Sequence, residues 1–87
     1  MTKEEKKIAI ELMYRMRTEG TTTDYSKYAK NIVKMDEAKM AGIVGILKDM
    51  KLVEKLDGYA PTSIRLTEAG TNFKSFWFYN AWQRHSP

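Results

Sequence analysis

Three stretches of the chain place apolar residues at the spacing of amphipathic helices. The first has an apolar stripe with steps of three or four positions, made by Ile8, Ala9, Leu12, Met13 and Met16. Thr2 and Glu5 stand where a capping box would begin this helix, and Gly20 follows as a stop signal. The pattern predicts a helix over residues 3–18.

The second and third helical patterns are short and follow one another closely. A helix over 24–33 is predicted from an apolar face of Tyr25, Tyr28, Ala29, Ile32 and Val33. A helix over 37–50 is predicted from Met40, Ile43, Val44 and Leu47. Asp36 is a good N-cap for the latter, with Met35 and Met40 in the two positions of a hydrophobic staple. Because so few residues separate the two helices, the pattern is typical of a helix-turn-helix.

A β-hairpin and one more helix complete the predicted elements. Alternating residues predict strands over 52–56 and 63–66, on either side of a turn that contains Gly58 and Pro61. Thr67 is the expected cap of a last helix over 68–83. The fold class is therefore mainly α with a small β-hairpin, and a length of 87 residues fits a single domain over 1–87.

Two segments of the chain resemble the winged helix-turn-helix superfamily. The segment 47–55 is similar to the passage from the recognition helix into the wing. The run Ile64-Arg65-Leu66-Thr67-Glu68-Ala69-Gly70 is similar to the motif that closes the wing in bacterial regulators of the MarR and PadR types, or in small phage-like proteins. The resemblance implies a three-helix core, a two-stranded wing and a C-terminal helix. It also implies binding to double-stranded DNA, with the third helix in the major groove.

Composition narrows the classes of function. The chain has 43% hydrophobic and 30% charged residues, as globular proteins do, and its net charge of +4 favours an acidic partner. It has no cysteine and one histidine, His85, so we expect no thiolate or histidine metal site. Its carboxylates are scattered over the predicted helix surfaces, and no phosphate-binding Gly-rich loop follows a strand. We therefore expect no enzyme activity and no cofactor. No apolar run reaches the ~20 residues of a membrane span, and the N-terminal residues lack a signal-peptide pattern. We expect a cytoplasmic protein that does not enter membranes.

The candidate DNA-binding residues lie in three places. The predicted second helix carries Lys27, Lys30 and Lys34 on one face with no acidic residue in 25–34, which suits phosphate contacts, although a solvated face would look the same. The third helix offers Lys39 and Lys48, and the wing offers Tyr59 and Arg65. The rest of the outward surface of the third helix is poor in side chains that read bases.

The outward surface of the predicted third helix carries small residues instead, namely Ala38, Ala41, Gly42 and Gly45. They allow something to approach closely. The sequence leaves three alternatives: packing against the first helix or the hairpin, contact with a partner protein, or contact with DNA.

The C-terminal region has more aromatic residues than one core contact needs. Phe76, Trp77, Phe78, Tyr79 and Trp82 spread around the predicted last helix. Trp and Tyr are common at interface hot spots, so this density predicts a homodimer interface; the alternative is that one small core absorbs these rings. Together these patterns predict a homodimeric DNA-binding protein, a transcriptional regulator in which backbone contacts dominate. The alternative is a winged-helix protein–protein interaction module with a protein partner.

Overall fold

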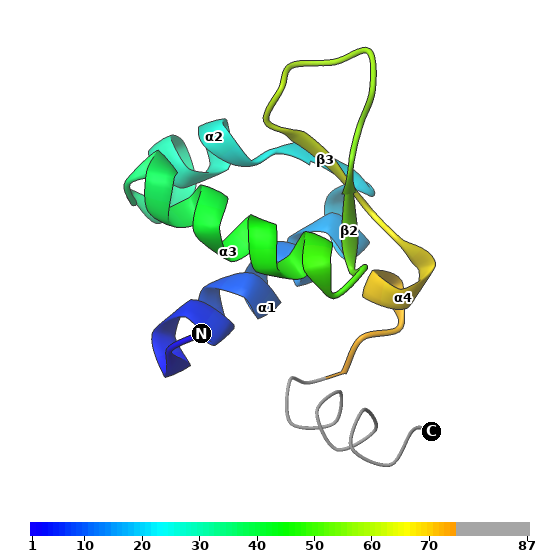
Figure 1. The fold of residues 1–87 in the computed structure, drawn as a ribbon, viewed down its shortest axis with the longest axis horizontal. Helices are drawn as coiled ribbons and strands as arrows, with labels where there is room; N and C mark the ends of the chain where they lie inside the picture. Colours follow the sequence, from blue (N-terminus) through cyan, green and yellow to red (C-terminus); the bar gives the residue numbers. More distant parts are fainter. Residues whose placement is uncertain (75–87) are drawn as a thin grey trace.

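The helices and strands follow one another in nearly the order that the sequence predicts. The structure, a computed structural model, describes residues 1–74. Figure 1 shows the elements, which are α1 (Lys3–Glu19), β1 (Thr22–Asp24), α2 (Tyr25–Tyr28), the π-helix η1 (Ala29–Val33), α3 (Glu37–Asp49), β2 (Val53–Lys55), β3 (Ser63–Leu66) and α4 (Glu68–Thr71). They form a compact, mainly α-helical domain with a small antiparallel sheet, consistent with a winged-helix-like topology.

One core holds α1, α3 and the sheet together. The predicted stripes of α1 and α3 are confirmed: Leu12 and Met13 face Met40 and Leu47 in a cluster of fully buried side chains, while Ile8 is half-buried. Leu52, Val53, Ile64 and Leu66 extend this cluster into the sheet. Burying a side chain of this size contributes about 1.5–3 kcal/mol, so these contacts dominate the stability of the domain.

The predicted helix caps are confirmed. The Glu5 N–H donates to Thr2 Oγ1 (3.1 Å) and the Thr2 N–H donates to Glu5 Oε1 (2.7 Å), which completes the capping box of α1. At α3 the Asp36 carboxylate accepts from the Ala38 N–H (3.2 Å). Each cap satisfies backbone donors that have no partner inside their helix.

The second helix is continuous from α2 into η1 but changes its winding on the way. In this α2–η1 segment (residues 25–34, which include the C-cap Lys34) the Ala29 carbonyl accepts from the N–H groups of both Lys34 and Met35, and Lys34 ends the helix in a left-handed conformation (φ 61°). A π-helix fits more residues into each turn than an α-helix does, so side chains past Ala29 are rotated relative to the predicted face. The prediction that Ile32 belongs to the buried face is therefore wrong, because this residue is 51% exposed.

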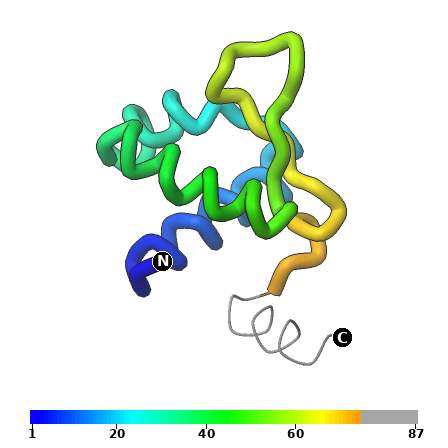
Figure 2. Tube along the Cα trace, in the orientation of Figure 1, coloured from blue at the N-terminus to red at the C-terminus, as the bar shows by residue number. Residues whose placement is uncertain are grey.

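The sheet has three strands rather than the two of the predicted hairpin. β3 lies in the centre and pairs antiparallel with β1 and with β2. Arg65 of β3 stands opposite Thr22 on one side and Glu54 on the other. No strand is predicted at residues 22–24, because a three-residue strand is too short to show an alternating pattern. The loop between β2 and β3 extends away from the helices (Figure 2).

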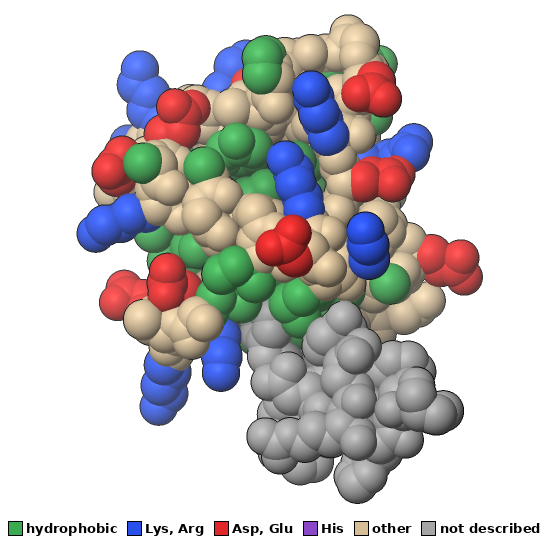
Figure 3. All heavy atoms as spheres, viewed as in Figure 1, with side chains coloured by type: hydrophobic (Ala, Val, Ile, Leu, Met, Phe, Trp, Pro, Cys, Tyr) green, Lys and Arg blue, Asp and Glu red, His purple; other side chains and the backbone are tan. Residues whose placement is uncertain are grey.

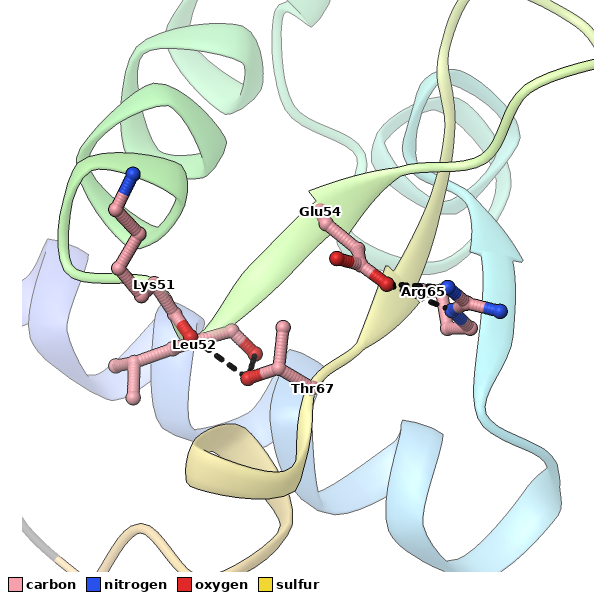
Figure 4. A network of polar contacts seen from close by, with 5 residues as sticks. All are labelled: Lys51, Leu52, Glu54, Arg65 and Thr67. Carbon is pink, nitrogen blue, oxygen red and sulfur yellow. Dashed lines mark hydrogen bonds and ion pairs between the residues drawn. The ribbon is translucent and has the colours of Figure 1, made fainter.

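Thr67 joins the end of the wing to the turn that precedes it. Its backbone N–H donates to the Leu52 carbonyl (3.0 Å), and its hydroxyl donates to the Lys51 carbonyl (2.7 Å) with the Leu52 carbonyl also in reach (3.0 Å) (Figure 4). The same hydroxyl accepts from the Gly70 N–H (3.0 Å) and so caps α4, as predicted. Gly70 is buried against this turn, since a Cβ placed there would lie 2.1 Å from the Leu52 carbonyl oxygen.

α4 is shorter than the predicted helix over 68–83. It ends at Thr71, and residues 72–74 are not helical. Arg17 Nη1 of α1 donates to the carbonyls of Gly70 and Phe73 (both 3.3 Å), which fixes the chain in a non-helical path there. Gly, Thr and Asn at 70–72 are also weak helix formers. The remainder of the predicted helix lies outside the described residues.

The close approach at Gly70 yields a test of the fold. Gly70→Ala is expected to destabilise the domain by about 2–3 kcal/mol, because the added methyl group overlaps backbone that cannot move without breaking the Thr67 hydrogen bonds. Urea unfolding followed by circular dichroism measures the change. Ala69→Ser, at the exposed neighbouring position, should stay within about 0.5 kcal/mol of the wild type. A wild-type midpoint for Gly70→Ala would contradict this account of the α4 contact.

Candidate nucleic-acid interface

The α2–η1 segment presents three lysines that have no acidic partner. Lys27, Lys30 and Lys34 are exposed. Within residues 1–74 the ion pairs join Arg15 to Glu19 and Arg65 to Glu54, and no carboxylate oxygen lies within 4.0 Å of any of the three lysine ammonium groups. The other lysines of residues 1–74 also form no ion pair, so what distinguishes these three is their spacing on one short segment. Lys27 lies near Asp24, and its charge is a smaller cause of the lowered pKa of that carboxyl.

Asp24 fixes the start of this segment to the wing. Its carboxylate oxygen Oδ1 accepts from the Ser26 N–H (3.0 Å), as an N-cap does, and from the Thr62 hydroxyl (2.5 Å). The Thr62 hydrogen bond is the main reason that the pKa of Asp24 lies below its ordinary value. Since Thr62 belongs to the loop between β2 and β3, the lysine-bearing segment and the wing are held in a fixed relation.

The outward face of α3 is open at its small residues. Within residues 1–74, a Cβ added at Gly42 or at Gly45 would meet no neighbouring atom within 4 Å. The alternative in which these glycines make room for α1 or the hairpin is therefore wrong, and contact with DNA or with a partner protein remains. Ile46 lies beside them and is 37% exposed. Figure 3 shows this side of the molecule, where basic and acidic side chains are interspersed around apolar and small ones.

Lys39 of α3 lies near acidic residues, as Lys27 lies near Asp24. Lys39 lines a hollow at the start of α1 together with Glu4 and Glu5. Its charge contributes to lowering the pKa of Glu5, although the hydrogen bonds from Thr2 are the larger cause. Lys48 is half-buried. The structure thus places Lys39 next to acidic residues.

The wing brings together the two residues that the sequence singled out there. Tyr59, which is 70% exposed, and Arg65 line one hollow of about 370 Å³ with the threonines of β1. Arg65 is also paired with Glu54, since its Nε lies 2.9 Å from Glu54 Oε1 and its Nη2 contacts the same oxygen (Figure 4). This carboxylate partly balances the positive charge of Arg65.

Two features of this surface were missed in the sequence. Glu54 could have been found by aligning the predicted strands, because the hairpin register places it opposite Arg65. Arg15 lines a further hollow with Lys27, and no local pattern signals this, because it depends on how α1 packs beside the α2–η1 segment.

Two other features are absent from residues 1–74. The part of the chain that the structure describes contains no group of three or more His, Cys, Asp or Glu side chains able to hold a metal ion. No helix among residues 1–74 is long and apolar enough to cross a membrane. The predicted dimer-interface residues Phe76, Trp77, Phe78, Tyr79 and Trp82 lie outside the described residues.

No protein-family model, curated protein or solved structure matches this chain.

The open face of α3 leads to a prediction about stability. Gly42→Ala and Gly45→Ala should each stabilise the domain by roughly 0.5–1 kcal/mol, because alanine is the better helix former and the added methyl group meets open space. Thermal unfolding should show a rise in Tm of a few degrees for each. Gly58→Ala is the matched control: it also enters open space, but φ is +83° at this position, so it should destabilise. A loss of stability in Gly42→Ala would mean that this face is packed.

Proposed function

We propose that this chain is a small DNA-binding protein that holds duplex DNA mainly through its phosphate backbone. The observation that carries the proposal is the set of three exposed lysines without acidic partners on the α2–η1 segment. In helix-turn-helix proteins the corresponding helix crosses the DNA backbone, where lysines position the protein without reading sequence. The winged-helix-like topology and the resemblance of the wing-closing motif support membership of the winged helix-turn-helix superfamily.

Direct reading of bases contributes little in this proposal. The outward ridge of α3 carries Ala38, Gly42 and Gly45, which have no side-chain donors or acceptors. Lys39 sits beside Glu5 and Arg65 is paired with Glu54. Binding should therefore depend weakly on sequence and strongly on salt, with a slope of about −2.7 for three phosphate contacts of one protomer.

A homodimer would double these contacts and bring two α3 helices to one duplex. The proposed interface is the aromatic cluster Phe76, Trp77, Phe78, Tyr79 and Trp82. Its support is the number of large rings in one short segment, which exceeds what one small core needs. A dimer with this shape suits a transcriptional regulator acting in the cytoplasm, with no cofactor and no enzyme activity.

A second candidate function is a protein–protein interaction module. The observation that favours it is the open ridge of α3, where Gly42 and Gly45 leave space and Ile46 is partly exposed. Small residues let a partner helix approach closely, and an apolar side chain at the edge would be covered by it. In this alternative the chain would not bind DNA specifically.

Removing the lysines of the α2–η1 segment tests the proposed function. Changing Lys27, Lys30 and Lys34 together to Ala should weaken binding about equally for unrelated duplexes and flatten the salt dependence by about 2.7 per protomer. Fluorescence anisotropy with two labelled duplexes of different sequence, at several salt concentrations, measures both quantities. The control removes the same charge from α1 by changing Lys3, Lys6 and Lys7 to Ala. Equal losses in both variants, or wild-type protein that binds neither duplex, would contradict the proposal.

Sedimentation equilibrium at micromolar concentration tests the dimer. The expected mass is twice the 10.1 kDa of one chain, and Trp82→Ala should shift it toward the monomer. Tyr14→Ala is a suitable control, because it removes an aromatic side chain that is 60% exposed on α1. A wild-type mass near 10.1 kDa would overturn the dimer and leave the aromatic residues to the monomer.

A further inference from the structure

A hollow of about 260 Å³ lies between α1, β1 and the α2–η1 segment. Its lining residues are Arg15, Thr23, Asp24, Lys27, Tyr28, Asn31 and Ile32. Two of these side chains are cationic and one is a carboxylate. We call it the Arg15 hollow.

Arg15 is held in place by two contacts, while part of its guanidinium group makes no hydrogen bond within residues 1–74. Its Nε lies 2.8 Å from Glu19 Oε2, and its Cζ lies 5.7 Å from the centre of the Tyr28 ring. Among the described residues, Nη1 and Nη2 of Arg15 have no hydrogen-bond partner. A guanidinium fixed on one edge and on one face loses little freedom when its remaining N–H groups bind an oxyanion.

The other walls of the hollow complement this donor. Lys27 brings a second cation without an ion-pair partner, and the Asn31 side chain brings an amide that makes no hydrogen bond within residues 1–74. Asp24, the carboxylate among the lining residues, already accepts from Ser26 and Thr62 through Oδ1. The charge of Lys27 is a smaller cause of the lowered pKa of Asp24, so this carboxylate is a partial counter-charge in the hollow. The remaining donors of Arg15, Lys27 and Asn31 outnumber this one carboxylate, which favours an anion.

The π turn gives this hollow an apolar edge. A regular α-helix would place Ile32 on the buried face with Tyr28 and Ala29, whereas η1 leaves it 51% exposed at the rim. Exposing part of an isoleucine side chain has a cost in free energy that a ligand with a carbon skeleton would remove. π-helical turns are rare and are often found at functional sites.

We propose that the Arg15 hollow binds a phosphate group. Arg15 and Lys27 take its charge, Asn31 donates to a further oxygen, and the carbon skeleton next to the phosphate packs on Ile32. Two sources have this chemistry: a backbone phosphate of DNA with its deoxyribose, and a free phosphate ester. The first source rests on the proposed function and makes Arg15 a further contact of the same interface; the second does not depend on it.

The first arm of the test uses inorganic phosphate alone. Phosphate is titrated into ¹⁵N-labelled full-length protein at constant ionic strength, and the Arg15 Nε–H and Asn31 side-chain signals are followed by NMR. We expect saturable shifts that Lys27→Gln weakens several-fold. Lys30→Gln removes the same charge from the same helix without lining the hollow, so it should have little effect. Shifts that do not saturate, or that both variants weaken equally, would overturn the proposal.

The second arm identifies the source of the phosphate. Arg15→Gln should weaken duplex binding roughly 5–10-fold at 0.1 M salt and reduce the salt slope by about 0.9, as expected for one lost phosphate contact. Lys7→Gln, an equal charge loss elsewhere on α1, should change binding much less, and an unchanged Tm should show that both variants fold.

The two arms separate the outcomes. Saturable phosphate binding with no effect of Arg15→Gln on duplex affinity would support the hollow as a site for a free phosphate ester. Wild-type protein that binds no duplex would overturn the proposed function, while the phosphate titration would still decide for or against the hollow.

Discussion

The contact between Thr67, Gly70 and the Leu52 carbonyl is the constraint on which the relative positions of the other elements depend. It ties together the end of α3, the start of β2, the end of β3 and the start of α4 (Figure 4). Lys51 enters this turn with φ of 63°, a conformation that costs a non-glycine residue about 1–2 kcal/mol, and the Thr67 hydroxyl bonds its carbonyl. Because Arg17 also donates to the Gly70 carbonyl, α1 is joined to the same point. The angle between α3 and the wing is therefore set by backbone contacts that tolerate no Cβ at position 70.

This contact also explains why part of the fold can be predicted from the sequence. Leu66 is buried, Thr67 caps α4 and Gly70 lies against the Leu52 carbonyl, so these three residues of the wing-closing motif each have a physical role. The capping box, the Asp36 cap and the stripes of α1 and α3 are local, and the structure confirms them. The predictions that failed concern features that depend on residues distant in the sequence or on the winding of the helix. β1 exists because β3 pairs with it, and Ile32 is exposed because the winding changes at Ala29, which no spacing of apolar residues reveals.

The candidate site likewise has features that the sequence predicts and features that depend on tertiary packing. The spacing of Lys27, Lys30 and Lys34 shows that they share one helix, and this requires only the sequence. Whether a carboxylate lies near a cationic side chain depends on packing. Lys39 lies near Glu5 because α3 begins beside α1. Arg65 pairs with Glu54 because of the register between β2 and β3. Exposed ion pairs contribute about 0–1 kcal/mol to stability, so the effect of Glu54 on the wing lies more in the charge it neutralises than in the fold it supports. The α2–η1 segment thus gathers three exposed lysines within a short stretch, of which Lys27 lies near Asp24.

The same segment is where the backbone departs furthest from ideal geometry. It holds a π turn, a lysine in the left-handed conformation where glycine is usual, and an exposed isoleucine. Each of these features lowers stability, and no contact within residues 1–74 compensates for the exposure of Ile32. Natural sequences break local rules mainly where binding requires it. A regular α-helix would return Ile32 to the core face. The side chains of Asn31 and Lys34 would then point in other directions. The irregular winding therefore determines how the polar and cationic side chains of this segment are presented, which connects the structural cost to the binding role proposed above.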